Sequence, residues 1–249
     1  EIIDVYPIFN TCFSIKNNKW YQTMKDTSKY FIETYNVENY NEFEKLLAAL
    51  QGSLDIHEKL YNFCLINFNG RNYLFFVIHH LIIDGVSWRV FLDSFSRRLM
   101  SIEKNGEKII APNFSEWVRY IEDYKVSEDV SEYWNQFELY PQKNNISFST
   151  VDHEVIEFSS RETERFKEIV NESYFADMES FLLSMVSNAF YKNFVSQKFL
   201  VKIEGHGRPW KAEQFNDSLG WFTSVYPFQS TTNDNLKDSI IEIHNRLGS

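Results

Sequence analysis

The stretch YLFFVIHHLIIDGVSWRVF, from Tyr73 to Phe91, decides the fold of this chain. It opens with six aromatic and aliphatic residues, Tyr73 to Ile78, a run typical of a strand that is buried on both faces. His79 and His80 follow where that strand ends. Because side chains alternate across a strand, we expect one histidine to pack inward and the other to face a cleft. Only one of the pair is then placed to meet a ligand.

The composition is that of a globular chain without a nucleic-acid partner. Its 249 residues, with 23 Phe and 14 Tyr, are enough to bury a sizeable core. The net charge of −10 would repel a phosphate backbone. No apolar run approaches the roughly 20 residues that span a bilayer, and the first residues lack the features of a signal peptide. We therefore expect a cytoplasmic protein that binds neither nucleic acid nor membrane.

Cysteine and histidine usage does not predict a metal site. Cys12 and Cys64 lie in apolar, strand-like surroundings, where free cysteine behaves as a small hydrophobic residue. The six histidines are scattered, and neither a CxxC nor an HExxH pattern occurs. We expect two reduced structural thiols and no bound metal.

The pattern of apolar residues predicts two α/β halves. Strand material is expected over residues 5–35 with a turn at KNNK, and further strands over 60–67, 71–78, 154–160, 198–203 and 220–228. Helices are expected over 40–50, 87–103, 113–137, 161–173, 177–194 and 236–247. Residues 139–151 lose this periodicity and gain Pro, Asn and Ser, which predicts a linker. The halves are then 1–138 and 152–249.

The HHLIIDG segment is a candidate for acid/base chemistry. A histidine at the exit of a strand is held accurately and can accept a proton near neutral pH. Asp84 can orient an imidazole or pair with an arginine, and Gly85 lets the backbone turn into the next helix. The alternative is that both histidines are structural residues at a strand end.

A second candidate is EGHGR, residues 204–208, which places a carboxylate, an imidazole and a guanidinium in five positions separated by glycines. Glycines allow close backbone approach, as expected at a site, but a simple turn with a surface arginine fits equally well. A third block, SLGWFTSVYP over residues 218–227, is by default a buried strand. Its Trp221, Thr223 and Ser224 are alternatively the wall of a pocket.

Together these three motifs resemble those of a known protein family. HHLIIDGVSW resembles the HHxxxDG motif of the condensation-domain superfamily of nonribosomal peptide synthetases, which includes acyltransferases of the chloramphenicol acetyltransferase type. DGVSWR, EGHGR and GWFTSVYP resemble epimerization domains more than condensing ones, which usually have DGWS and lack the EGHGR glutamate. Pro209 and Trp210 depart from the pattern, since an acidic residue is common after the arginine. The implied fold is α/β, two-lobed and chloramphenicol acetyltransferase-like, with mixed sheets and an active site between the lobes.

The resemblance also implies a reaction. The substrate is an aminoacyl or peptidyl thioester on the 4′-phosphopantetheine arm of a peptidyl carrier protein, with other synthetase domains as partners and no cofactor bound by this domain. The α-carbon is inverted from L to D, with His80 and Glu204 on opposite sides as acid and base in an order that the sequence does not assign. Supporting roles fall to His79, packed inward, and to Asp84, Gly85, Gly205, His206 and Arg208, with Asp84 bracing the histidine loop through an arginine. The implied substrate channel consists of Trp88, Trp221, Thr223, Ser224 and Tyr226.

Two other functions stay open. One is condensation or another acyl transfer, in which His80 assists attack on the thioester by an amine or alcohol. The other is a catalytically silent module that docks the carrier protein. Family domains normally extend before the equivalent of Asp4 and beyond the GWFTSVYP block, so the resemblance implies a chain truncated at both ends.

Overall fold

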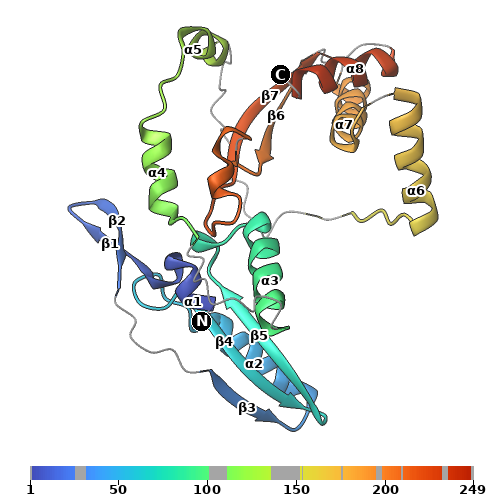
Figure 1. The fold of residues 1–249 in the computed structure, drawn as a ribbon. Helices are drawn as coiled ribbons and strands as arrows, with labels where there is room; N and C mark the ends of the chain where they lie inside the picture. The colour runs from blue at the N-terminus through green and yellow to red at the C-terminus, as the bar shows by residue number, and fades with distance from the viewer. Residues whose placement is uncertain are drawn as a thin grey trace. The chain divides into compact units, whose positions relative to one another are not determined.

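The computed structural model describes residues 2–25, 32–100, 111–135, 152, 154–174, 176–194, 198–208, 210–231 and 235–247. The chain forms two compact units (Figure 1). The first unit contains Glu1–Lys125 and Gly205–Ser224, and the second contains Val126–Glu204 and Val225–Ser249. The units are not consecutive stretches of sequence, because Gly205–Ser224 clusters with the first unit although its sequence follows the predicted linker. That linker, at 139–151, lies outside the described residues.

The first unit is built on a mixed sheet with the strand order β3-β4-β5. β3 (Glu33–Val37) pairs in parallel with β4 (Tyr61–Phe68), and β4 pairs antiparallel with β5 (Arg71–Ile78). The Asn69-Gly70 turn between them has positive φ at both residues, 50° and 70°, as a tight hairpin turn requires. The two strands and the turn predicted from the sequence are thereby confirmed.

The expectation that β5 is buried on both faces was wrong. Tyr73 and Leu74 are each 38% exposed, and Ile78 is the first buried residue along the strand. The buried strand is β4, which lies between its two neighbours, whereas β5 is an edge strand of the described sheet. An apolar run alone does not distinguish these two positions.

A separate hairpin precedes this sheet. β1 (Thr11–Lys16) and β2 (Lys19–Met24) pair antiparallel around Asn17 and Asn18, whose φ angles are 50° and 59°. Two successive residues with positive φ are typical of the type I′ turn, so the hairpin predicted at KNNK is confirmed. The chain before it forms α1 (Ile2–Val5) and the 3₁₀ turn η1 (Pro7–Asn10) in place of the expected strand.

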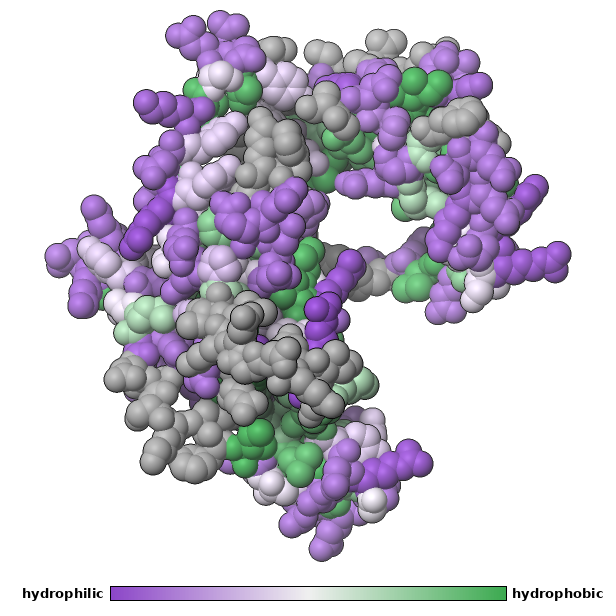
Figure 2. All heavy atoms as spheres, viewed as in Figure 1, coloured by the Kyte–Doolittle hydropathy of each residue, from purple (hydrophilic) through white to green (hydrophobic). Residues whose placement is uncertain are grey.

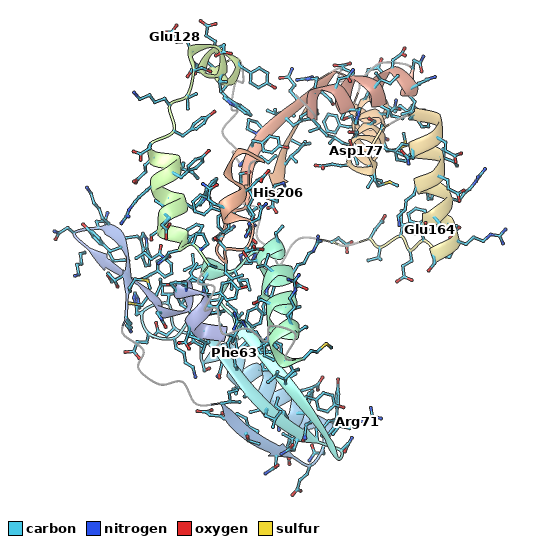
Figure 3. All side chains as sticks on the ribbon, viewed as in Figure 1. Phe63, Arg71, Glu128, Glu164, Asp177 and His206 are labelled. Atoms are coloured by element: carbon cyan, nitrogen blue, oxygen red, sulfur yellow. The ribbon has the colours of Figure 1, made fainter. Side chains whose placement is uncertain are left out.

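The helices of the first unit cover its core. They are α2 (Tyr40–Gly52), α3 (Gly85–Leu99) and α4 (Phe114–Glu122), with the 3₁₀ segments η2 (His80–Ile82) and η5 (Trp210–Phe215). Phe91 of α3 is fully buried, with its ring centroid 5.7 Å from that of Phe63 in β4 and 5.2 Å from that of Phe76 in β5. Figure 3 labels Phe63 within this cluster. Such aromatic pairs add about 0.5–1.5 kcal/mol each to the free energy of burial, so this cluster anchors α3 on the sheet.

The second unit is mainly helical. It contains α5 (Glu128–Asn135), α6 (Ser160–Ile169), the π-helical turn η4 (Val170–Tyr174), α7 (Met178–Phe194) and α8 (Leu236–Leu247), with β6 (Lys198–Gly205) paired to β7 (Ser224–Thr231). α8 is tied to the start of α7 because Asp177 accepts a 2.8 Å hydrogen bond from Nδ1 of His244. The side chains of α6 are largely hydrophilic (Figure 2), as its charged sequence indicates.

Three further expectations were wrong. Residues 154–159 form no strand, and Val155 and Ile156 are 80% and 79% exposed. The expected helix over 113–137 is two helices, α4 and α5. The apolar sequence of 177–194 predicts a buried helix, but this helix is only partly buried, since Leu182 and Val186 are each 54% exposed. The N-cap of α6 is Ser159, which forms a capping box with Glu162.

Candidate functional site

The two histidines at the end of β5 have different surroundings. The N–H of His79 donates to the carbonyl oxygen of Leu60 at 2.7 Å, which continues the pairing of β5 with β4. The half-buried His79 ring accepts a 3.2 Å hydrogen bond from the N–H of Leu81 through Nδ1 and so caps η2. The side chain of His80 is exposed. His80 is therefore the histidine of this pair that can meet a substrate.

Trp221 lies beside His80. The centroids of the two rings are 5.1 Å apart and the ring planes are inclined by 58°. Trp221 is 46% exposed, so part of its side chain faces solvent. Both residues belong to the first unit.

Asp84, four residues after His80, starts α3. Its Oδ1 accepts a 2.7 Å hydrogen bond from the N–H of Ser87, which is the bond of a helix N-cap. Its Oδ2 accepts a 2.9 Å hydrogen bond from the N–H of Phe222. Asp84 is only 2% exposed, so a single buried carboxylate joins the start of α3 to the segment that carries Trp221.

Arg208 supplies the opposite charge. Its Nη1 is 3.3 Å from Oδ2 and 3.4 Å from Oδ1 of Asp84, and its Nη2 donates to Oγ of Ser87 at 2.8 Å and to the carbonyl oxygen of Ser218 at 3.2 Å. The guanidinium carbon lies 3.9 Å from the centroid of the Phe222 ring, a cation–π contact. Two buried charges are tolerated only when they are paired and hydrogen-bonded in this way.

Burial acts on both charges of this pair. Burial alone would raise the pKa of Asp84, but the hydrogen bonds from Ser87, the charge of Arg208 and the N–H of Phe222 outweigh it, and the pKa lies below its ordinary value. Burial lowers the pKa of Arg208, and the Asp84 carboxylate opposes that shift. Asp84 is therefore a carboxylate throughout the physiological range.

The hydroxyl of Ser87 completes the network. Its Oγ donates to the carbonyl oxygen of Gly220 at 2.9 Å and accepts from the N–H of Gly220 at 3.1 Å as well as from Nη2 of Arg208. One donor and two acceptor positions are all that a hydroxyl has. Ser87 is fully buried and its hydrogen-bonding capacity is fully used.

Two glycines are required by close packing. Gly207 has a φ of +66°, and a Cβ there would overlap the carbonyl oxygen of Phe222. A Cβ on Gly220 would overlap the ring of Phe114. Gly85 was expected to make room for the turn into α3, but it has no positive φ and a Cβ there would meet nothing within 4 Å. The positions at which close packing requires glycine therefore lie in the Gly207 and Gly220 segments and not at the start of α3.

The remaining residues that the resemblance singled out are distributed over both units. In the first unit, Trp88 is half-buried with its ring centroid 5.9 Å from that of Phe91, and His206 (Figure 3) is exposed with Nδ1 accepting from the N–H of Arg208 at 3.1 Å. Thr223 is half-buried, Ser224 begins β7 exposed, and Gly205 ends β6.

In the second unit, Glu204 is exposed in β6, directly before the segment that packs with the first unit. Tyr226 is half-buried in β7, and its pKa is raised by burial and by the charge of Glu179. The structure thus gathers the histidine loop, Arg208 and Trp221 into one unit.

The sequence analysis did not identify Ser87, Gly220 or Phe222 as parts of the site. Ser87 carries only a weak signal, because serine and aspartate are both favoured near the start of a helix whatever their tertiary contacts. The pairing of its hydroxyl with Gly220 depends on tertiary structure and has no local signal.

Within the described ranges, the His, Cys, Asp and Glu side chains form no group of three that could hold a metal ion. Among the described helices, none combines the length and the apolar character needed to cross a bilayer. Cys12 and Cys64 are free and buried, as expected.

Comparisons with known proteins agree on one family. The condensation-domain family matches residues 1–247. Surfactin synthase subunit 1 of Bacillus subtilis (strain 168) is 30% identical over 214 residues, which is 79% of this chain and 6% of that protein.

Two solved structures share the fold over 99% of this chain and 62% of their own chains. The epimerization domain from the third module of tyrocidine synthetase B has a TM-score of 0.76 and 20% identity. The condensation domain from Monacolin K polyketide synthase has a TM-score of 0.76 and 15% identity. The predicted α/β, chloramphenicol acetyltransferase-like class with mixed sheets is confirmed.

Proposed function

This chain belongs to the condensation-domain family, and on that premise we propose that it inverts the α-carbon of a carrier-bound substrate. The substrate is an aminoacyl or peptidyl group held as a thioester on the phosphopantetheine arm of a peptidyl carrier protein. The reaction converts the L to the D configuration. The protein is then an amino-acid epimerase within nonribosomal peptide synthesis.

The chemistry of inversion requires two groups. One removes the α-proton, which is weakly acidic beside a thioester, and the other returns a proton to the opposite face of the planar intermediate. His80 suits either task, because its exposed imidazole has one ring nitrogen that can accept a proton and another that can donate one. Glu204 is an exposed carboxylate that suits the complementary task.

The observation that carries the proposal is the buried ion pair between Asp84 and Arg208. His80 lies four residues before Asp84, and Glu204 lies four residues before Arg208. Within the first unit, the pair joins the loop that carries His80 to the segment Gly205–Ser224, which follows Glu204 directly in the sequence.

The test is inversion of a loaded carrier. A carrier protein bearing an L-aminoacyl thioester is incubated with the protein in deuterated water, and the chirality and deuterium content of the amino acid are measured. We expect D product with deuterium at the α-carbon, and loss of inversion by about 100-fold or more in His80→Ala and Glu204→Gln. The matched control is Glu164→Gln, which changes an exposed glutamate of α6 that pairs with Lys167.

Condensation is the second candidate, because His80 serves amide formation as well as inversion. Glu204 has no task in amide formation, so this residue distinguishes the two candidates. Adding an amine acceptor to the same assay tests this candidate. Amide product with an unchanged L configuration, and an active Glu204→Gln variant, would replace the epimerase by a condensing enzyme. If a folded protein and a loaded carrier yield neither inversion nor amide product, the remaining function is carrier docking without catalysis.

A further inference from the structure

The backbone around Trp221 is held on both sides by buried side chains of α3. Before it, the carbonyl oxygen and the N–H of Gly220 both bond to Oγ of Ser87, at 2.9 and 3.1 Å. After it, the N–H of Phe222 bonds to Asp84 at 2.9 Å. The Trp221 side chain itself is 46% exposed.

The ring of Phe114 limits the same segment from a third direction. It lies where a Cβ of Gly220 would be, and its centroid is 5.1 Å from that of the Phe222 ring at an angle of 89°. Gly220 therefore has little freedom to move toward Phe114. Movement away from Phe114 is opposed by the two hydrogen bonds to Ser87.

The hydroxyl of Ser87 is not needed for α3 to form. The N-cap bond to Asp84 uses the backbone N–H of Ser87, which any residue but proline provides. Without the hydroxyl, Arg208 would keep Asp84 and the carbonyl oxygen of Ser218. Gly220 would lose both of its hydrogen bonds to Ser87. The hydroxyl thus acts on the residue directly before Trp221 as well as on Arg208 and Asp84.

We propose that Ser87 is a positioning residue: through Gly220 it sets Trp221 against His80 and so fixes the direction of the exposed imidazole. The indole, 5.1 Å away, removes rotamer freedom that an exposed histidine would otherwise have. A reactive side chain held in one direction gains rate because less reorganisation precedes proton transfer. The effect on rate rests on the proposed function, whereas the effect on the ring contact does not.

The ring contact is tested by NMR on protein with ¹³C-labelled histidine, with the His80 signals assigned by their loss in His80→Ala. The indole shifts the ring protons of His80, and we expect Trp221→Leu to abolish that shift. Ser87→Ala should remove most of it. The matched control is Ser184→Ala, which deletes another fully buried serine hydroxyl, one that donates within its own helix to the carbonyl oxygen of Ser180.

Ser87→Cys is a second variant, which tests the proposal even if Ser87→Ala does not fold. A thiol is larger than a hydroxyl but still fills the site, and it is a weaker donor and acceptor, so the His80 shift should fall between those of the wild type and Trp221→Leu. An unchanged His80 shift in either Ser87 variant, in protein that retains its cooperative thermal unfolding, would overturn the proposal.

The rate is tested in the inversion assay. For Ser87→Ala we expect kcat to fall about 10- to 100-fold while KM stays within about twofold, because the group that is misaligned takes part in proton transfer. A rise in KM with unchanged kcat would contradict the positioning role. If even the wild type fails to invert the substrate but the NMR shifts change as described, the proposed function fails and the Ser87 to Trp221 relationship stands.

Discussion

Nη1 of Arg208 lies 3.3 Å from Oδ2 of Asp84, and the two side chains are only 3% and 1% exposed. The pair joins the loop that follows the two histidines to the segment that follows Glu204. Removing two charges from water costs free energy that their mutual attraction need not repay. We therefore expect this pair to matter mainly by fixing how the two backbone segments align. Each partner also binds a backbone group of the Ser218 to Phe222 segment. The pair is therefore the fixed point of the candidate site.

Removing one charge of this pair should be strongly destabilising. Asp84→Asn leaves the buried guanidinium of Arg208 without its counter-charge, and we expect the free energy of unfolding to fall by about 3–5 kcal/mol. Urea unfolding followed by circular dichroism measures this value. The matched control is Asp93→Asn, which breaks the 2.7 Å pair with Arg97 on the exposed side of α3 and should cost less than about 1 kcal/mol. Equal losses in the two variants would show that the buried pair has no special weight.

Stability should fall in acid partly through Asp84. Its pKa is lower in the folded chain than in the unfolded chain, where it is about 3.9. The unfolded chain therefore binds the proton first as the pH falls, and the contribution of Asp84 is complete above about pH 4 and is lost as the pH passes through the folded pKa. Asp177, whose pKa is also lowered, adds a second contribution of the same sign.

Unfolding free energies measured between pH 6 and pH 2 test this dependence. The decrease should be smaller in Asp84→Asn, because that variant has no proton to bind at this position. An identical pH dependence in the wild type and the variant would exclude Asp84 as a source of acid lability.

The sequence predicted the hairpins well because their signals are local. Asn17-Asn18 and Asn69-Gly70 adopt the positive φ angles that such pairs favour, and the strands on either side follow directly. The apolar run of β5 was misjudged because burial depends on which strands pair with it, and β4 took the central position. The run at 154–160 has a strand-like composition, but 154–159 pairs with no described strand.

Those parts of the candidate site that lie within contiguous sequence motifs could be predicted. An exposed histidine after β5 follows from residue types at fixed offsets, whereas an arginine partner for Asp84 was one of two alternatives from the residues and was implied by the family resemblance. The packing of the Gly220 segment on Ser87 does not follow from such offsets, because a hydroxyl that bonds a distant glycine has the same local sequence as one that bonds water. The assignment of Gly85 as the required glycine failed for the same reason, since the close contacts lie at Gly207 and Gly220.

Replacing Gly207 and Gly85 by alanine should have opposite effects on the free energy of unfolding. Gly207→Ala places a Cβ on a residue with positive φ and against the carbonyl oxygen of Phe222, so we expect a loss of more than about 1 kcal/mol in the free energy of unfolding. Gly85→Ala meets nothing within 4 Å and lowers the entropy of the unfolded chain, so stability should stay equal or rise by up to about 1 kcal/mol. Thermal unfolding of the two variants beside the wild type decides the matter. A stable Gly207→Ala protein would mean that this loop can move away from Phe222.

The last prediction concerns which group takes the proton from which face. In a two-sided site, a variant that lacks one group still has the other, which can remove the α-proton from its own face and return a solvent deuteron to that same face. His80→Ala and Glu204→Gln should therefore each retain α-proton exchange, without inversion, from one configuration of the substrate and lose it from the other. The configurations should be opposite for the two variants.

Carriers loaded separately with L- and D-aminoacyl thioesters, followed by mass spectrometry for deuterium, reveal the pattern. Exchange of the L substrate by Glu204→Gln would make His80 the base for the L configuration, and exchange of the L substrate by His80→Ala would make Glu204 that base. Loss of exchange from both configurations in both variants would mean that His80 and Glu204 act as one unit on a single face. The second proton donor would then have to be sought elsewhere, since inversion requires a group on each side.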